Sequence, residues 1–308
     1  MSLWPGARIP DLSGQTVVVT GANSGIGFYA ALEFARAGAE VVLACRSAER
    51  GGKALAQIEA QAPSRARLEL LDLSDFAAIH DFAAKVKEHC GKIDILLNNA
   101  GVMAPPVRRT TEQGFELQFG VNFLGHFLLT ALLLGPLMKS KAPRIIQVSS
   151  VAHRQGEMAW DDLQSERRYQ AWNAYRQSKL AMLIFAQELG RQAEKGGWGL
   201  LSLAAHPGIA ATELVVNGPG RNSMIARLQK IGAPFVQQSG DAGAWPLIFA
   251  AVDPAARQGA YYGPQGWLEF RGIPGAAKIE PKALNEGTAR QLWETAEQLT
   301  GVPFRLAP

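Results

Sequence analysis

Short apolar segments alternate with longer amphipathic segments along most of the chain. The first, Thr16–Thr20, is too short for a helix and rich in β-branched residues, so we expect a strand there. A run with helical spacing follows over residues 26–37 and ends before Gly38. The same alternation predicts further strands at 40–45, 67–71, 93–98, 144–149, 200–205 and 259–262, and further helices at 48–61, 75–89, 112–139, 171–194 and 284–299. Apolar strands separated by helices are typical of an α/β fold with a doubly wound parallel sheet.

No internal repeat, low-complexity tract or linker interrupts this alternation, so we expect a single domain over residues 1–308. Residues 207–238 do not fit the alternation and are rich in glycine, proline and mixed apolar residues. Irregular segments of this kind often cover ligand sites, and the sequence therefore predicts a mobile lid there.

The charge distribution argues against a nucleic-acid partner. The net charge is +4 over 308 residues, and no run of basic residues exceeds three. Nucleic-acid binding needs clustered Lys and Arg, which this sequence does not show. The two cysteines and five histidines have no metal-ligand spacing, so we expect no metal site.

The most apolar stretch, residues 123–138, is interrupted by glycines, a histidine and a proline. It is too short and too broken to span a bilayer, and we expect a buried or subunit-contacting helix. The N-terminus shows no basic region followed by an apolar core, so no secretory signal is predicted. These features favour a cytoplasmic protein.

A glycine-rich segment, Thr20–Gly27, follows the first strand and opens the first helix. In that context Gly21 allows a tight turn, Gly25 lets backbone approach a pyrophosphate, and Gly27 permits close packing of helix on sheet. The helix N-terminus adds amide donors and a partial positive charge. The sequence therefore predicts a dinucleotide site on a Rossmann fold.

The end of the second strand bears on which nicotinamide cofactor binds. NAD-binding proteins place an acidic residue there, whereas an arginine accommodates the 2′-phosphate of NADP. Residues 44–47 read ACRS, with Arg46 and no carboxylate, which favours NADP(H). Arg46 as an ordinary solvated side chain, in an NAD-linked enzyme, is the alternative.

A phenol and an ammonium lie four residues apart in the segment 175–179, which reads YRQSK. Positions i and i+4 share one face of a helix, so the Lys179 ammonium is expected beside the Tyr175 hydroxyl. A neighbouring cation favours phenolate, and we predict that Lys179 lowers the pKa of Tyr175. Tyr175 is thus a candidate proton donor and acceptor.

Together these segments resemble the short-chain dehydrogenases/reductases over about residues 13–265. The matching segments, in the family's order, are Thr20–Gly27, Asp72-Leu73, Asn98–Gly101, Asn122, Ser150, Tyr175 with Lys179, and Pro207–Thr212. The resemblance implies a catalytic tetrad of Asn122, Ser150, Tyr175 and Lys179. It implies cofactor contacts from Gly21, Asn23, Ser24, Gly25, Ile26, Gly27, Arg46, Asp72, Leu73, Asn99, Ala100, Gly101, Tyr175, Lys179, Pro207, Gly208, Ile209 and Thr212.

The resemblance also implies a mechanism. Tyr175 exchanges a proton with the substrate oxygen as hydride passes to or from the nicotinamide. Ser150 donates a hydrogen bond to that oxygen, Lys179 holds the nicotinamide ribose, and Asn122 positions a water that links Lys179 to solvent. The cofactor half would cover about residues 13–150, and the catalytic and substrate half 151–308.

Within the family, the details are most similar to the retinol dehydrogenase-like group and its bacterial members. They are the ACR ending at residues 44–46, the gap from Ser150 to Tyr175, and the segments 206–212 and 261–264. This likeness implies an NADP(H)-dependent reaction on a lipophilic carbonyl or alcohol, in a dimer or tetramer. Because few residues precede the first strand, no membrane anchor is expected. A catalytically idle, NADP(H)-sensing binding protein is the alternative of another class.

Several positions leave two interpretations open. Side chains alternate along a strand, so only one of Ser149 and Ser150 should face the site, and motif alignment favours Ser150. Asn98 and Asn99 have the alternative of linking neighbouring strands, which is the favoured interpretation for Asn98, and Asn122 has the alternative of a plain buried amide. Four tryptophans and a methionine are candidates for an apolar substrate pocket, although core packing explains most of them equally well: Trp160, Trp172, Trp245, Trp267 and Met224.

Overall fold

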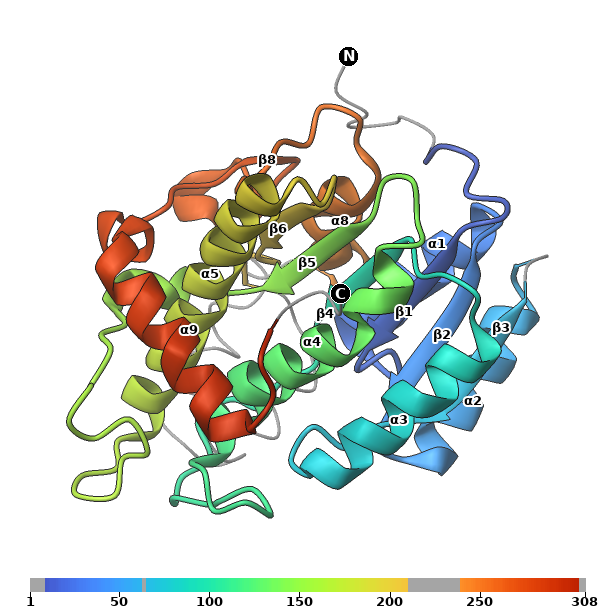
Figure 1. The fold of residues 1–308 in the computed structure, drawn as a ribbon. Coiled ribbons are helices and arrows are strands. Elements are labelled where there is room, and N and C mark those ends of the chain that lie inside the picture. The colour runs from blue at the N-terminus through green and yellow to red at the C-terminus, as the bar shows by residue number, and fades with distance from the viewer. Residues whose placement is uncertain (1–8, 63–64, 210–238, 305–308) are drawn as a thin grey trace.

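The computed structural model describes residues 9–62, 65–209 and 239–304, which build one eight-stranded sheet covered by helices (Figure 1). The strand order is β3-β2-β1-β4-β5-β6-β7-β8, parallel except for β8, which pairs antiparallel with β7 at one edge. The strands are β1 (Thr16–Thr20), β2 (Glu40–Cys45), β3 (Ala66–Leu70), β4 (Ile95–Asn98), β5 (Arg144–Val148), β6 (Leu201–Ala205), β7 (Tyr261–Pro264) and β8 (Pro274–Ala276). The predicted doubly wound parallel sheet of the Rossmann type is confirmed.

Two helical layers bury the two faces of the sheet. One layer holds α1 (Gly25–Arg36), α2 (Ala48–Glu59) and α8 (Gly240–Val252); the other holds α3 (Phe76–His89), α4 (Gly125–Leu137), α5 (Ala171–Gly196) and α9 (Glu286–Thr300). Alternate strand residues supply the two cores: Val17 and Val19 of β1 pack with α1, whereas Val18 packs with α3 and α4. Because both faces are covered, the strands read as continuous apolar runs rather than alternating ones.

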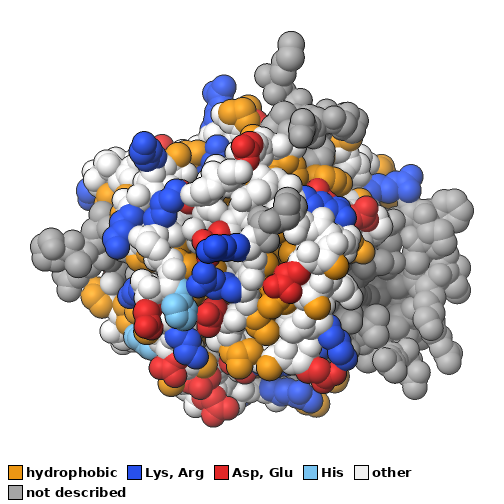
Figure 2. Space-filling model, turned by 90° about the vertical axis from the view of Figure 1, so that its right-hand side faces the viewer, with side chains coloured by type: hydrophobic (Ala, Val, Ile, Leu, Met, Phe, Trp, Pro, Cys, Tyr) orange, Lys and Arg blue, Asp and Glu red, His pale blue; other side chains and the backbone are white. Residues whose placement is uncertain are grey.

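The face that carries β3, α2 and α3 shows acidic and basic side chains interspersed with apolar ones (Figure 2). Ion pairs join Lys53 to Glu49 within α2, and Arg67 of β3 to Glu40 of the neighbouring strand β2. On this face, the described residues therefore present no field of a single sign that would attract a polyanion.

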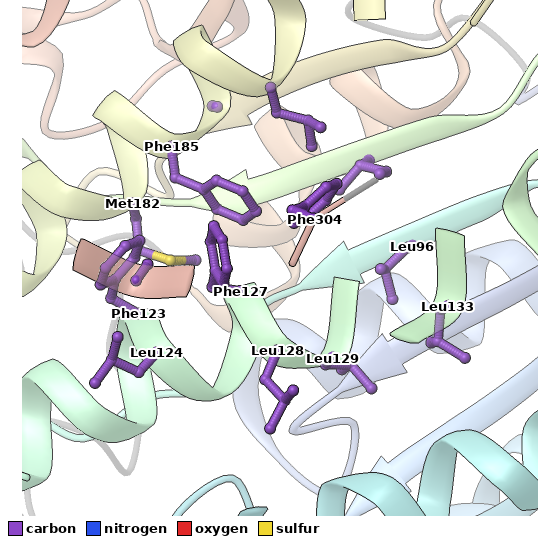
Figure 3. Packing of buried hydrophobic residues seen from close by; sticks show 14 of the residues in the cluster. Leu96, Phe123, Leu124, Phe127, Leu128, Leu129, Leu133, Met182, Phe185 and Phe304 are labelled. Carbon is purple, nitrogen blue, oxygen red and sulfur yellow. The ribbon is translucent and has the colours of Figure 1, made fainter. Parts of the chain in front are cut away.

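The most apolar stretch of the sequence, residues 123–138, lies in the core. Phe123 and Phe127 pack against Phe185 of α5, and Phe304 and Trp293 close the cluster from the C-terminal side (Figure 3). Within the described ranges, one helical run, 119–137, is long and apolar enough to cross a membrane by length and composition, and 83% of it is buried inside the protein. This burial agrees with the predicted core helix and removes its value as an argument for a subunit contact.

The helix predicted over 112–139 begins later than expected. Residues 110–116 form a turn instead, closed by a β-bridge between Thr110 and Glu116, with Gly114 in the left-handed region at φ 84°. The chain then enters a π-helical turn, η1 (Phe119–Leu124), before α4. Such turns interrupt the regular backbone ladder and are frequent at functional sites.

Two elements of the C-terminal region were not predicted. Helix α8 is apolar on all sides and contains Pro246, so it lacks the periodicity that marks an amphipathic helix. Strand β8 has three residues and begins with a proline, which suits only an edge position. Strand β7 starts two residues later than predicted and ends at Pro264.

Candidate functional site

The strand order reverses between β1 and β4, and ligands of doubly wound sheets bind in the crevice at such a point. At the end of β1, Gly21 has a φ of 68°, in the left-handed region that glycine adopts without cost. A Cβ on Gly27 would collide with the Gly21 carbonyl oxygen and the Asn99 side chain. The tight turn and the close helix packing predicted for these glycines are both present.

The N-terminus of α1 offers amide donors to this crevice. The Ser24 side chain occupies the N-cap position but makes no capping hydrogen bond, and its oxygen instead accepts a long one, 3.4 Å, from Asn23 Nδ2. In α2, by contrast, the N-cap Ser47 hydroxyl accepts from the Arg50 amide. The first-turn amides of α1, at Gly25, Ile26 and Gly27, are therefore available to an anion such as a pyrophosphate.

Thr20 and Asn99 join the glycine turn to the end of β4. The Thr20 hydroxyl oxygen accepts from the amides of Asn99 (2.8 Å) and Ala100 (2.9 Å), and Asn99 Nδ2 donates to the Thr20 carbonyl (2.8 Å). Next along the chain, a Cβ on Gly101 would lie 3.7 Å from Lys179 Nζ. Residues 99–101 thus run from the glycine turn to the lysine of the predicted tetrad.

Asn98, in contrast, has a structural position. Its side-chain amide donates to the Thr130 hydroxyl (2.9 Å) and to Gln147 Oε1 (3.0 Å). These contacts link β4 to α4 and to β5, so the interpretation of Asn98 as a tie between elements is confirmed.

The ends of β2 and β3 hold the predicted adenosine contacts. Arg46 is exposed directly after β2. Asp72 Oδ1 accepts from the amide (2.9 Å) and hydroxyl (2.6 Å) of Ser74, which fixes the turn after β3. Leu73 is buried at 5% exposure and packs in the core beneath that turn. Arg46 is therefore placed to reach a ligand at this edge of the sheet.

Tyr175 and Ser150 meet at the carboxyl end of β5. The Tyr175 side chain is 5% exposed, and its hydroxyl interacts with the Ser150 side chain. Ser149 points away from this pair, since its hydroxyl donates to the Lys179 carbonyl at 2.7 Å. The structure thus places Ser150, and not Ser149, beside the tyrosine.

Lys179 is buried on the same face of α5. Its Nζ donates to the Val148 carbonyl of β5 at 2.9 Å and lies 5.9 Å from the centroid of the Tyr175 ring. Burial lowers the pKa of Lys179 to about 8. An ammonium that is easily deprotonated and held by a backbone carbonyl stabilises a phenolate only weakly.

The prediction that Lys179 lowers the pKa of Tyr175 is wrong for this arrangement of protein groups. Burial raises the pKa of Tyr175 to about 12, and the hydrogen bond with Ser150 opposes this rise only in part. The physical reason is that a phenolate loses its hydration in this enclosed position. Spacing in the sequence indicated the neighbour correctly but not the burial.

Asn122 lies in the π-helical turn η1 and is fully buried. Its side chain accepts from the Val102 amide (2.8 Å) and donates to the Val102 carbonyl (3.0 Å) and the Ser178 hydroxyl (2.9 Å). The amide therefore ties the segment after β4 to α5. The interpretation of Asn122 as a buried structural amide accounts for these contacts, and its water-positioning role stays a prediction.

His126 links Asn122 to the glycine turn, a role that was not predicted for it. Its Nδ1 lies 2.8 Å from the Asn122 carbonyl and its Nε2 lies 2.9 Å from the Thr20 hydroxyl. Because the Thr20 oxygen already accepts two amides, its own proton donates to Nε2, which leaves the His126 proton on Nδ1. Burial lowers the pKa of His126 to about 4, which agrees with this neutral form.

The nicotinamide side of the predicted site follows β6. Gly208 has a φ of 67° and donates its amide to His206 Nδ1 (3.1 Å), while the Ile209 amide donates to the Phe270 carbonyl (2.9 Å). Pro207, Gly208 and Ile209 thus form a compact turn. The predicted contact Thr212 and most of the predicted lid, residues 210–238, lie outside the described residues.

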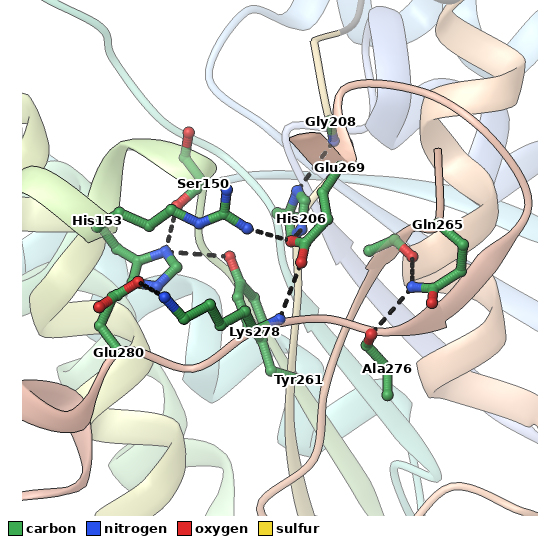
Figure 4. A network of polar contacts seen from close by, with 12 residues as sticks. Ser150, His153, His206, Gly208, Tyr261, Gln265, Glu269, Ala276, Lys278 and Glu280 are labelled. Carbon is green, nitrogen blue, oxygen red and sulfur yellow. Dashed lines mark hydrogen bonds and ion pairs between the residues drawn. The ribbon is translucent and has the colours of Figure 1, made fainter. Parts of the chain in front are cut away.

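A second polar network includes Ser150, His153, His206, Tyr261 and Glu269 (Figure 4). The Ser150 carbonyl lies 2.7 Å from His153 Nδ1, and His206 Nε2 lies 3.0 Å from Glu269 Oε2. Tyr261 lies between the two imidazoles, with ring centroids 5.3 Å from His153 and 5.1 Å from His206. The functional residues missed in the sequence are therefore those that support the site through hydrogen bonds. The candidate reactive groups themselves were all predicted. Spacing gave a signal for one of the missed residues, since His126 is four residues after Asn122.

The candidate pocket residues do not form a single wall. The Trp172 ring meets the Tyr175 ring edge-on, with centroids 5.9 Å apart. Trp160 packs against the core of the α4 layer and Trp245 against that of the α1 layer, whereas Trp267 is 73% exposed. Met224 lies outside the described residues. Of the four candidate tryptophans, Trp172 is the one whose ring meets the Tyr175 ring.

The family profile of the short chain dehydrogenases matches residues 15–219, two thirds of the chain. The chain belongs to the short chain dehydrogenase family. The expected membership is thereby confirmed, and with it the assignment to an oxidoreductase family that uses NAD or NADP.

Relatives of this short-chain dehydrogenase cover nearly all of it. Retinol dehydrogenase 13 of Homo sapiens is 42% identical over 96% of this chain and 86% of its own length, and retinol dehydrogenase 12 of Mus musculus is 38% identical over 96% and 89%. The resemblance to the retinol dehydrogenase-like group is confirmed at the level of homology.

Solved structures agree. An uncharacterized protein from Mycobacterium paratuberculosis superposes with a TM-score of 0.81 at 36% identity and covers 98% of this chain and 99% of its own. A protein of Shigella flexneri 2A str. 301, described as a short chain dehydrogenase complexed with NADP, has a TM-score of 0.64 at 25% identity and covers 82% and 97%.

Proposed function

We propose that this protein is an NADP(H)-dependent oxidoreductase that interconverts a carbonyl compound and an alcohol, with Tyr175 as the general acid and base. The observation that carries the proposal is that the buried Tyr175 side chain and the Ser150 side chain interact at the carboxyl end of β5. The pair lies at the carboxyl edge of the sheet, beside Lys179 and the segment that leads to the glycine turn. Two hydroxyls that converge in a buried position form a site for the oxygen of a carbonyl or alcohol.

The residues present fit a dinucleotide cofactor. The turn at Gly21 and the uncapped N-terminus of α1 would hold the pyrophosphate. Arg46 would contact the 2′-phosphate, Asp72 would lie near the adenine, and Pro207–Ile209 near the nicotinamide. When bound, NADPH supplies the hydride. The NADP in the Shigella flexneri relative supports this choice of cofactor.

The protonation state of Tyr175 suits carbonyl reduction. With a pKa of about 12, Tyr175 carries its proton at neutral pH and is ready to donate it to the substrate oxygen. Ser150 donates a second hydrogen bond to that oxygen as negative charge develops on it. In the oxidative direction Tyr175 must first lose its proton, which this degree of burial opposes.

Lys179 can take part in returning the proton. Burial brings its pKa to about 8, so it both loses and regains a proton near neutral pH. Lys179 and Tyr175 are neighbours on α5, which lets the proton lost by the phenol in one turnover be replaced from the lysine side.

The substrate class follows from the relatives and from Trp172. The retinol dehydrogenases are named for a lipophilic alcohol. The indole of Trp172 against the Tyr175 ring gives this site an apolar flank. We therefore propose a lipophilic aldehyde, ketone or alcohol as the substrate.

Arg46→Ala tests the cofactor assignment. Loss of a hydrogen-bonded cation at the 2′-phosphate should raise the KM for NADPH about 10- to 100-fold and leave that for NADH nearly unchanged. The control is Lys53→Ala, which removes an exposed cation from the adjacent helix α2. Both constants should be measured by loss of reduced-nicotinamide absorbance with a panel of carbonyl compounds.

Each alternative has its own outcome in this assay. If Arg46→Ala weakens NADPH and NADH equally, Arg46 does not read the 2′-phosphate and the NADP assignment fails. If the wild-type protein binds NADPH tightly but turns over no carbonyl compound or alcohol in the panel, the idle binding protein is the better description.

A further inference from the structure

A strained turn between β7 and β8 carries Glu269 into the protein. Hydrogen bonds from Gln265 to Ile273 and from Gly266 to Arg271 close the turn. Leu268 (φ 51°) and Glu269 (φ 60°) are adjacent there, and they are two of the four non-glycine residues with positive φ in the described chain. This backbone conformation is unfavourable for side chains of L-residues.

Burial of apolar surface does not explain the turn. Trp267 and Leu268 stay 73% and 52% exposed, whereas the Glu269 side chain is only 18% exposed. The conformation therefore leaves large apolar side chains in water and brings a carboxylate inward, the reverse of the usual preference. Specific polar contacts must hold it.

Glu269 makes three such contacts (Figure 4). Its Oε2 lies 2.6 Å from Arg154 Nη2 and 3.0 Å from His206 Nε2, and its Oε1 accepts from the Lys278 amide at 3.0 Å. Burial alone would raise the pKa of this carboxyl, but the hydrogen bond from His206 and the other two contacts lower it below its usual range. Glu269 is thus an ionised group with its acceptors occupied.

The partners of Glu269 belong to two different segments that border the site. Arg154 lies in the short 3-10 turn η2 (Val151–Gln155), which follows Ser150 directly. His206 precedes the Pro207–Ile209 turn and accepts the Gly208 amide. The Glu269 carboxylate therefore joins the turn that follows Ser150 to the Pro207–Ile209 turn.

The backbone of the same turn makes a second contact with the Pro207–Ile209 turn. The Phe270 carbonyl accepts from the Ile209 amide at 2.9 Å, and a Cβ on Gly208 would collide with that carbonyl. The turn around Glu269 thus touches residues 206–209 at both ends, through a side chain and through the main chain.

We propose that Glu269 is a positioning residue for hydride transfer, which holds the Ser150 segment and the Pro207–Ile209 turn at a fixed separation. This inference rests on the proposed function, because it assigns the nicotinamide to the Pro207–Ile209 turn. Glu269 touches neither the substrate nor the cofactor in this account. Its effect is on the angle and the distance between the substrate and the nicotinamide.

The test uses Glu269→Ala and the milder Glu269→Gln, with Glu188→Gln as a matched control. Glu188 is also a largely buried carboxylate paired with an arginine, Arg191, but it lies on the far part of α5. Three quantities should be measured: the Kd for NADPH, the emission spectrum of bound NADPH, and kcat, with Tm as a record of folding.

In Glu269→Ala we expect a Kd within about threefold of the wild type, because the glycine turn and Arg46 are unchanged, and a kcat about 10- to 100-fold lower. The emission of bound NADPH should shift towards that of free NADPH, since its ring is held less firmly. Glu269→Gln keeps one acceptor oxygen, for either His206 or the Lys278 amide, and should recover part of kcat. Glu188→Gln should change Tm at most.

The inference is overturned if Glu269→Ala keeps the wild-type kcat and emission spectrum while only Tm falls, because Glu269 would then be purely structural. If Glu269→Ala does not fold, the same comparison on Glu269→Gln decides. A wild-type protein without NADPH turnover would instead contradict the proposed function itself.

Discussion

The two sides of the site are held by contacts of different kinds. Behind β1 and β4, neutral groups link Thr20, Asn99, Asn122 and His126 through hydrogen bonds. Behind β5 and β6, charged groups meet around Glu269. Both sides join segments that are distant in the sequence, since Thr20 lies 79 residues from Asn99 and 106 from His126, and His206 lies 63 residues from Glu269. The difference teaches that neutral hydrogen bonds hold the cofactor side together, whereas a single carboxylate and its charged partner hold the nicotinamide side.

The largest expected effect on stability comes from breaking the neutral side at Thr20→Val. The new side chain has nearly the same shape, but in this fully buried position it leaves the Ala100 amide without its acceptor and the Asn99 amide with the Leu97 carbonyl alone. We expect the free energy of unfolding to fall by about 4 kcal/mol. Urea denaturation measures this change.

Thr300→Val is the control for Thr20→Val. Its hydroxyl donates to the Ala296 carbonyl of its own helix, and no amide of the described residues donates to it, so its loss should cost about 1 kcal/mol or less. An equal loss in the free energy of unfolding in the two variants would mean that the hydrogen bonds accepted by the Thr20 hydroxyl do not stabilise the cofactor side.

A smaller effect is expected from pH acting on His126. Burial lowers its pKa to about 4, below the usual value near 6.5, so between these values the unfolded chain binds a proton that the folded protein refuses. Stability should therefore fall as the pH drops from about 6.5 to 4, by up to about 3 kcal/mol for this group. His153, whose pKa burial also lowers to about 4, adds to the same trend.

His126→Gln isolates the share of His126. A glutamine amide can donate to the Asn122 carbonyl and accept from the Thr20 hydroxyl, but it does not titrate. The variant should lose less stability between pH 6.5 and 4 than the wild type, whereas replacement of the exposed His80 by glutamine should not flatten the curve in the same way. An unchanged pH dependence in His126→Gln would show that His126 is not the neutral link described.

The smallest effect concerns the strained turn on the charged side. Leu268 adopts a left-handed conformation and exposes about half of its surface, and asparagine tolerates this conformation better. Leu268→Asn should therefore raise the free energy of unfolding by about 1 kcal/mol and leave kcat unchanged. A Tm below that of the wild type would indicate that the strain is not located there.

Most of the fold was predictable because the strands and helices repeat a simple alternation. The six strands from β1 to β6 were predicted within two residues at each end, because each is an apolar run bounded by polar or glycine positions. Helix α8 escaped prediction because an apolar helix that contains Pro246 has no polar face, and β8 because three residues carry no period.

The site was predictable to the extent that its residues follow strand ends directly. Ser150, Asn99 and the Pro207–Ile209 turn lie at the carboxyl edge for this reason. The shift in the pKa of Tyr175 was not predictable, because burial depends on elements far along the chain. The partnership of Glu269 with Arg154 and His206 arises only when β7 and β8 add to the sheet.

The central claim is that Tyr175 transfers the proton in an NADP(H)-dependent reaction, and single-turnover oxidation of NADPH by Tyr175→Phe with a carbonyl substrate tests it most directly. We predict a rate at least about 10³-fold below that of the wild type, with a nearly unchanged Kd for NADPH, because the phenylalanine keeps the packing and removes only the donor. A variant that oxidises NADPH at the wild-type rate would contradict the account.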